Sequence, residues 1–278
     1  MKSSTETKNL AVCSWSLLPT DPYDLIEKLK FTGINRVQLA LDPLRELPAI
    51  WGDVGDLLNN AGITIVSGMF SCVREDYSSL DSIRLSGGIV PDATWDKNLD
   101  NIRAILAIAV ELKLDRVTFH AGFVPHDSTD PNFTKMLKRL ATVAEIFASE
   151  EIAIGLETGQ ETAIELKNLL ETLQFPNLFV NFDPANMLLY GKGNPIEAMS
   201  LLKPWIGQVH IKDAIQSQIV GEWGEEVVVG SGDVDWQTFF SILTESNFSG
   251  EFVIEREVGD QRVIDVGHAR EVILKFIR

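Results

Sequence analysis

The sequence predicts a single α/β domain over residues 1–278, built as a closed barrel in which eight parallel strands alternate with eight helices. Three observations lead to this prediction. Short apolar runs alternate with helix-like stretches along the whole chain. The length of 278 residues suits one such barrel, since these barrels typically have about 250 residues. Polar residues stand where the apolar runs end, at the face where the strands of a parallel barrel carry their functional groups.

The first half of the chain contains four strand-and-helix pairs. The first predicted helix has Asp21 as its N-cap, Pro22 at its first position and Gly33 beyond its end. A longer irregular stretch over 71–93 interrupts the alternation once. The predicted strands are 10–16, 34–41, 63–70 and 115–120, and the helices are 22–32, an interrupted segment over 44–62, 95–112 and 132–150.

The second half repeats the pattern without a linker or a low-complexity tract, so we expect no domain boundary. A long loop over 214–235 separates its third strand from the helix that follows. We interpret this loop as a lid over the active face, with a contact between subunits as the alternative. The predicted strands are 152–157, 178–183, 206–213 and 251–255, and the helices are 161–173, 194–203, 235–246 and 263–277.

The composition of the chain limits which partners the protein can bind and where in the cell we expect it. A formal net charge of −16 repels nucleic-acid backbones, so we expect no nucleic-acid partner. The N-terminus has no apolar signal segment and no run of 18 apolar residues occurs, which indicates a cytoplasmic protein without membrane association. Cys13 and Cys72 fall in or beside apolar runs and are expected to be free thiols. A homo-oligomer is possible on this composition.

Four polar residues each end a strand-like run in the second half of the chain. They are Glu157, Asp183, His210 and Glu255. Because the carboxyl ends of barrel strands meet at one face, we expect the four side chains to lie together. Taken singly, each has an ordinary alternative: the acids could cap helices, and His210 could be a core residue. Their occurrence at four consecutive strand ends favours a shared site.

Two glutamates, one aspartate and one histidine form a ligand set for one divalent cation. Mn²⁺ is the preferred candidate, with Mg²⁺, Co²⁺ and Zn²⁺ as alternatives. Such an ion polarises a carbonyl and the neighbouring hydroxyl, which acidifies the carbon-bound proton between them. Glu157 and Glu255 could then remove and return that proton on opposite faces of a sugar.

The motifs around these residues resemble those of a known family. The segments GLETG, NFDPANMLLYG, GQVHIKDA, VVVGSGDVDW and GEFVIERE are similar, in order, to the sugar phosphate isomerase and epimerase family of xylose isomerase-like TIM barrels. The resemblance to its tagatose 3-epimerase-like members implies that Glu157, Asp183, His210 and Glu255 bind the metal and that the two glutamates form the acid and base pair. It covers nearly the whole chain but does not specify the substrate.

The same superfamily contains apurinic endonucleases, which hold three zinc ions with additional histidines. This chain has four histidines, and Asn186 stands where those nucleases have one. A trinuclear zinc site is therefore not expected, in agreement with the acidic charge.

Further residues at the predicted active face are candidates for contact with a small carbohydrate substrate. Each could instead have a packing, capping or metal-orienting role. These candidates are His120, Asn186, Lys212, Asp213, Trp15 and Trp223.

These observations predict a metal-dependent sugar isomerase or epimerase that works through an enediolate. A dehydratase or lyase acting on a keto-sugar or keto-inositol is the alternative enzyme, because the same intermediate can expel a hydroxyl group. A barrel that binds sugar without catalysis is the alternative outside enzymes.

Overall fold

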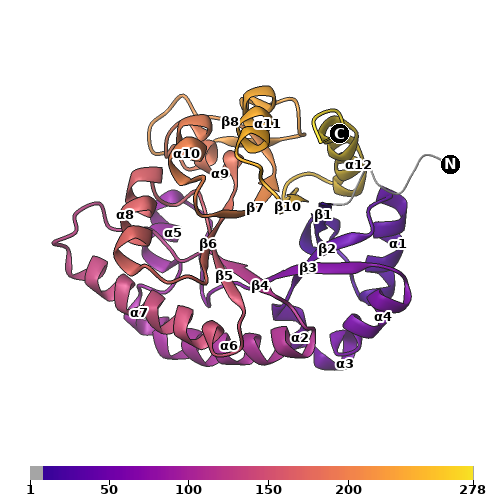
Figure 1. The fold of residues 1–278 in the computed structure, drawn as a ribbon, viewed down its shortest axis with the longest axis horizontal. Helices are drawn as coiled ribbons and strands as arrows, with labels where there is room; N and C mark the ends of the chain where they lie inside the picture. The colour runs from indigo at the N-terminus through magenta and orange to yellow at the C-terminus, as the bar shows by residue number, and fades with distance from the viewer. Residues whose placement is uncertain (1–8, 278) are drawn as a thin grey trace.

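The computed structural model describes residues 9–277, which form a closed barrel of parallel strands with helices around it (Figure 1). Around the barrel the strands follow the order β1-β10-β7-β6-β5-β4-β3-β2, so the first and last strands pair and close the sheet. The predicted eight-stranded (β/α)8 barrel is confirmed. Its strands are β1 (Leu10–Cys13), β2 (Arg36–Ala40), β3 (Thr64–Met69), β4 (Arg116–Phe119), β5 (Ala153–Glu157), β6 (Leu178–Phe182), β7 (Ile206–Ile211) and β10 (Glu251–Ile254).

Helices cover the outside of the barrel, and α12 packs beside α1 where the ring closes (Figure 1). The predicted start of the first helix is confirmed, because the Asp21 carboxylate accepts hydrogen bonds from the amides of Tyr23 and Asp24. The helices are α1 (Pro22–Thr32), α2 (Asp42–Glu46), α3 (Pro48–Trp51), α4 (Val54–Asn60), α5 (Leu80–Ser86), α6 (Asp92–Glu111), α7 (Pro131–Ala148), α8 (Ala163–Leu173), α9 (Pro184–Leu189), α10 (Pro195–Leu202), α11 (Trp236–Glu245) and α12 (Arg262–Ile273).

Several short elements differ from the sequence prediction. The first strand ends at Cys13, and the 3₁₀ helix η1 (Ser14–Leu17) follows it. The irregular stretch over 71–93 contains α5, and the interrupted segment over 44–62 is three separate helices. The long loop contains an antiparallel pair, β8 (Asp213–Ile215) and β9 (Glu225–Val227). These short helices and the three-residue strands β8 and β9 lack the continuous apolar runs that mark the barrel strands, which explains why the sequence did not predict them.

The core has two compartments. A large apolar cluster fills the space between strands and helices, while a small one inside the barrel contains Ala11, Cys13, Val66 and Val253. Beside the small cluster lie polar side chains that are fully buried. Both cysteines are buried free thiols, as expected. None of the helices in residues 9–277 is both long and apolar enough to cross a bilayer.

Candidate metal centre and active site

The four predicted ligands come together at the carboxyl ends of neighbouring strands. Glu157 ends β5, Asp183 follows β6 as the N-cap of α9, His210 lies in β7, and Glu255 follows β10. All four side chains are buried, and one candidate ligand atom from each lies within 4.8 Å of the others. His210 Nδ1 is 3.3 Å from Glu157 Oε1, 3.3 Å from Glu255 Oε2 and 3.7 Å from Asp183 Oδ2. The geometry provides one nitrogen and three carboxylate oxygens around one point.

Two of these atoms are buried without a hydrogen bond, which tests whether the site fits a cation. His210 Nδ1 and Asp183 Oδ2 make no hydrogen bond within residues 9–277. A buried polar atom without a hydrogen bond costs about 1–3 kcal/mol. Asp183 Oδ2 has an ion-pair neighbour in Lys212 Nζ at 3.3 Å, so the full cost applies to His210 Nδ1. Because both atoms face the other carboxylates, a divalent cation held by these four residues would satisfy them together. Three hard oxygen ligands with one imidazole suit Mn²⁺ or Mg²⁺, and Zn²⁺ and Co²⁺ also accept such a set.

Glu157 is held by amide side chains. Asn186 Nδ2 donates to Glu157 Oε1 at 2.9 Å, and Asn181 Nδ2 donates to Glu157 Oε2 at 3.3 Å. His120 Nε2 lies 3.6 Å from Glu157 Oε1. Burial alone would raise the pKa of Glu157, but His120 and His210 outweigh it and lower that pKa, so the carboxylate is ionised.

Lys212 places a buried positive charge beside the ligand set. Its Nζ lies 2.7 Å from Glu255 Oε2, 2.8 Å from Glu257 Oε2 and 3.3 Å from Asp183 Oδ2. Burial alone would lower the pKa of Lys212, but these carboxylates outweigh it and hold that pKa well above its usual value. In return, Lys212 and His210 outweigh the effect of burial on Glu255 and lower its pKa. Lys212 therefore contacts metal-ligand candidates rather than standing free for substrate.

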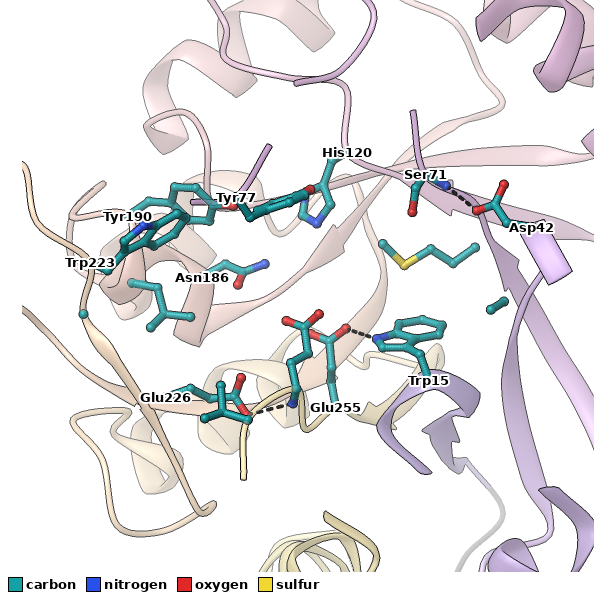
Figure 2. A pocket seen from close by; sticks show the side chains of 16 residues that line it. Trp15, Asp42, Ser71, Tyr77, His120, Asn186, Tyr190, Trp223, Glu226 and Glu255 are labelled. Carbon is teal, nitrogen blue, oxygen red and sulfur yellow. Dashed lines mark hydrogen bonds between the residues drawn. The ribbon is translucent and has the colours of Figure 1, made fainter. Parts of the chain in front are cut away.

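A cavity of about 590 Å³ reaches the ligand set at Glu255, which is the member of the set that lines it (Figure 2). Figure 2 shows Tyr77, Tyr190 and Trp223 on one side of it and Glu226 and Glu255 on the other. Aromatic rings can pack against the apolar face of a sugar, while carboxylates can accept hydrogen bonds from its hydroxyls. Among the described residues, the cavity lining includes four acids and neither lysine nor arginine; the acids are Asp42, Glu226, Glu255 and Glu257.

The other predicted candidates occupy different positions. Trp15, His120, Asn186 and Trp223 all line the cavity. Trp15 also donates from Nε1 to Glu255 Oε1 at 2.9 Å, so it orients a ligand as well as forming a wall (Figure 2). Asp213 does not line the cavity.

Asp213 is instead a buried acceptor that shapes the loop after β7. Its carboxylate accepts from the amides of Gly230 and Gly232 at 2.8 and 3.2 Å and from Trp236 Nε1 at 3.0 Å. These bonds fix the loop that brings Trp223 and Glu226 to the cavity.

The sequence analysis missed several residues of the site. Tyr77, Asp42, Glu226 and Glu257 line the cavity from loops and short elements that showed no pattern. Gln38 and Asn181 lie inside the barrel, fully buried within apolar strands. Gln38 and Asn181 could have been found in the sequence as polar residues in the middle of apolar strands.

Comparison with known proteins places the chain in a family. The model of the family described as xylose isomerase-like TIM barrel matches residues 23–275, which is most of the chain. The chain belongs to this family. The resemblance seen in the sequence motifs is thereby confirmed at the level of the family.

The individual proteins that resemble this chain share less than a third of their aligned residues with it. An inosose dehydratase of Clostridium botulinum (strain Eklund 17B / Type B) is 26% identical over 149 residues, covering 48% of the chain and 49% of that protein. The chain thus spans about half the length of the curated relative it matches. A solved xylose isomerase domain protein from Planctomyces limnophilus is 29% identical with a TM-score of 0.83, covering 90% of the chain and 91% of that structure.

Two further solved structures share the fold at low identity. One is an L-ribulose 3-epimerase, with a TM-score of 0.75, 15% identity and coverage of 97% of the chain and 94% of that structure. The other is a xylose isomerase-like TIM barrel protein from Mycobacterium smegmatis in complex with magnesium, with a TM-score of 0.74, 14% identity and coverage of 99% and 98%. At these identities the similarity establishes the fold alone.

Proposed function

We propose that the protein is a divalent-cation-dependent enzyme that isomerises or epimerises a small, uncharged sugar or sugar derivative by proton transfer. The observation that carries this proposal is the buried cluster of Glu157, Asp183, His210 and Glu255, of which Glu255 lines the cavity, with His210 Nδ1 and Asp183 Oδ2 lacking hydrogen bonds. Membership in the xylose isomerase-like family and the similarity to an epimerase structure support it.

The proposed chemistry uses the two glutamates as a base and an acid. A cation held by the four residues would polarise a carbonyl and an adjacent hydroxyl of the sugar, making the proton between them more acidic. Glu255 lines the cavity, and Glu157 contacts two residues that line it, His120 and Asn186. The lowered pKa of each glutamate keeps both ionised before substrate binds, so either can accept the proton from carbon. The glutamate that returns a proton on the other face would first take it from water.

The charge of the cavity favours a neutral substrate. A phosphate or carboxylate group would meet acidic residues at Asp42, Glu226 and Glu257, and the described lining offers no lysine or arginine to bind it. Arg45 and Arg256 are already paired with two of the lining acids, Asp42 and Glu226. We therefore expect the substrate to be recognised through hydroxyl groups and apolar ring faces.

Solvent deuterium exchange tests the proposal. We expect purified protein, incubated with Mn²⁺ and a neutral ketose in deuterated water, to introduce deuterium at a carbon atom of that ketose. The phosphorylated form of the same ketose should take up no deuterium. Glu157→Gln and Glu255→Gln should each lower the exchange rate by about 10²-fold or more, because each removes a proton-transfer group. Glu251→Gln is the matched control, since Glu251 starts the same strand that Glu255 follows and pairs with Arg36 away from the cavity. Exchange retained in both test variants would refute the roles of the two glutamates.

A dehydratase acting on a keto-sugar or keto-inositol is the second candidate, favoured by the similarity to an inosose dehydratase. It would release an unsaturated product that absorbs ultraviolet light, whereas an isomerase or epimerase returns a saturated sugar labelled at carbon. A barrel that only binds sugar would do neither. The same incubation therefore separates the three functions.

A further inference from the structure

We propose that Gln38 is a positioning residue of the metal centre, whose side-chain amide holds His210 in the tautomer that leaves Nδ1 free to bind a cation. Gln38 lies in the middle of β2, across the barrel interior from β7, and is fully buried. Gln38 does not line the cavity. Within the described residues it makes no hydrogen bond to Glu157, Asp183 or Glu255. The inference rests on the metal site of the proposed function.

The orientation of the Gln38 amide follows from its partners. Gln38 Nε2 donates to Thr118 Oγ1 at 2.8 Å, and the Thr118 hydroxyl lies 3.5 Å from the carbonyl oxygen of Gly68, to which it donates. Since the amide nitrogen is committed to Thr118, the amide oxygen must face His210. That oxygen, Gln38 Oε1, lies 2.7 Å from His210 Nε2.

A contact of 2.7 Å between an amide oxygen and a ring nitrogen requires a hydrogen on the nitrogen, because two acceptors at this distance repel each other. His210 Nε2 therefore carries the hydrogen and donates to Gln38. In the neutral ring, the lone pair is then on Nδ1, the atom that faces the three carboxylates and has no hydrogen bond. In the neutral ring, this contact therefore assigns the hydrogen to Nε2 and leaves Nδ1 as the atom that can bind a cation.

The competing neighbour of His210 Nε2 is Asn181, whose Nδ2 lies 3.1 Å away. A donation from Asn181 would require the opposite tautomer, with the hydrogen on Nδ1. Asn181 Nδ2 has another acceptor in Glu157 Oε2 at 3.3 Å, and its oxygen accepts from Gln208 Nε2 at 3.2 Å. Asn181 is thus satisfied without His210. Within residues 9–277, Gln38 Oε1 has no strong donor other than His210, since the Cys13 thiol at 3.5 Å is a weak one.

Metal affinity tests the inference with matched variants. Gln38→Met has similar length and no acceptor, so we expect it to weaken Mn²⁺ binding by about 10- to 100-fold, the usual effect of removing the partner of a ligating histidine. Gln38→Glu keeps an acceptor towards His210 and should bind Mn²⁺ at least as tightly as the wild type. Isothermal titration with Mn²⁺ gives the three dissociation constants, and thermal melting shows whether each variant is folded. A folded Gln38→Met variant with wild-type affinity overturns the inference.

An NMR measurement of the His210 tautomer tests the inference even if Gln38→Met fails to fold. The chain has four histidines, so long-range ¹H–¹⁵N correlation spectra of the wild type with Mg²⁺ are simple to assign by a His210 variant. The hydrogen is expected on Nε2 of His210. A hydrogen on Nδ1 overturns the inference, as does a wild type that binds neither Mn²⁺ nor Mg²⁺.

These outcomes are separate from those of the proposed function. A wild type that binds Mn²⁺ and shows the expected tautomer, yet exchanges no deuterium into any sugar, refutes the activity and leaves the role of Gln38 intact. An active wild type whose Mn²⁺ affinity is unchanged by Gln38→Met refutes the role of Gln38 alone.

Discussion

Lys212 shares its carboxylate partners with the candidate cation. Asp183 Oδ2 and Glu255 Oε2 each contact both Lys212 Nζ and the region in front of His210 Nδ1. One divalent ion and one lysine would together neutralise the charge of the three candidate ligand carboxylates. Without the ion, Lys212 Nζ lies closer to Asp183 Oδ2 and Glu255 Oε2 than His210 Nδ1 does, so its charge reduces the repulsion between these two buried acids.

Replacing Lys212 should therefore destabilise the metal-free protein more than the metal-bound one. Lys212→Met leaves Asp183, Glu255 and Glu257 without their cation, and breaking such a buried pair typically costs about 3–5 kcal/mol. Urea unfolding in the presence of a chelator measures this loss, and added Mn²⁺ should recover part of it. Lys203→Met is the control, because Lys203 is exposed at the end of α10. Equal losses in the two variants would contradict this role for Lys212.

The four candidate ligands could be chosen from the sequence because each stands at the end of a strand-like run. It did not predict Gln38 or Asn181, because the face that a strand residue uses is known only when its neighbours are known. Gln38 and His210 are 172 positions apart along the chain, and only barrel closure brings their side chains within 2.7 Å.

At the scale of elements, the pair β8–β9 forms one wall of the cavity. Trp223 lies between the two strands and packs on Tyr190 with ring centres 4.7 Å apart. Glu226 in β9 accepts hydrogen bonds from Arg256 Nη1 at 2.8 Å and from the amide of Glu257 at 2.9 Å. The loop that the sequence analysis interpreted as a lid thus contains a hairpin. The hairpin contacts the end of α9 through Trp223 and the segment after β10 through Glu226.

Gly232 is required for this hairpin to adopt its path. A Cβ atom at this position would lie 2.2 Å from Asp213 Oδ1, so Gly232→Ala must displace the carboxylate that organises the loop. We expect a loss of about 1–3 kcal/mol from the disturbed buried hydrogen bonds, with faster hydrogen exchange over residues 213–235. Thermal melting and exchange mass spectrometry check both effects.

Gly267 in α12 offers a matched control. An added Cβ there meets no atom within 4 Å, so Gly267→Ala should stabilise the helix by about 0.5–1 kcal/mol. A Gly232→Ala variant as stable as Gly267→Ala would show that the hairpin tolerates the displacement.

Long amphipathic elements were predictable from the sequence, whereas the short ones were not. The helices α6, α7 and α8 match their predicted ranges closely because each presents a continuous apolar face to the barrel. The helices α5 and α9 and the pair β8–β9 depend on contacts with other parts of the chain, such as the hydrogen bond from Gly224 N to Leu189 O.

On the scale of the whole molecule, the ligand set joins four adjacent strands of the ring, β5, β6, β7 and β10. A cation bound there would resist the separation of these strands and so oppose unfolding of the barrel. At a free Mn²⁺ concentration 100 times the dissociation constant, the expected stabilisation is about 2.7 kcal/mol. Differential scanning calorimetry with Mn²⁺ and with a chelator measures it.

Asp183→Asn should abolish most of this stabilisation while leaving α9 intact, because an asparagine side chain can still accept the N-cap hydrogen bond from the Asn186 amide. The same melting shift in the wild type and in Asp183→Asn would show that the ion binds elsewhere.

The pairing of β1 with β10 also sets an order of assembly. During synthesis the ribosome releases Glu157, Asp183 and His210 well before Glu255, and the gap between β1 and β7 remains until residues 251–254 enter it. A nascent chain that lacks β10 contains only three of the four candidate ligands, and its barrel is still open. A cation could therefore be held by all four residues only once this last strand has turned the open sheet into a ring.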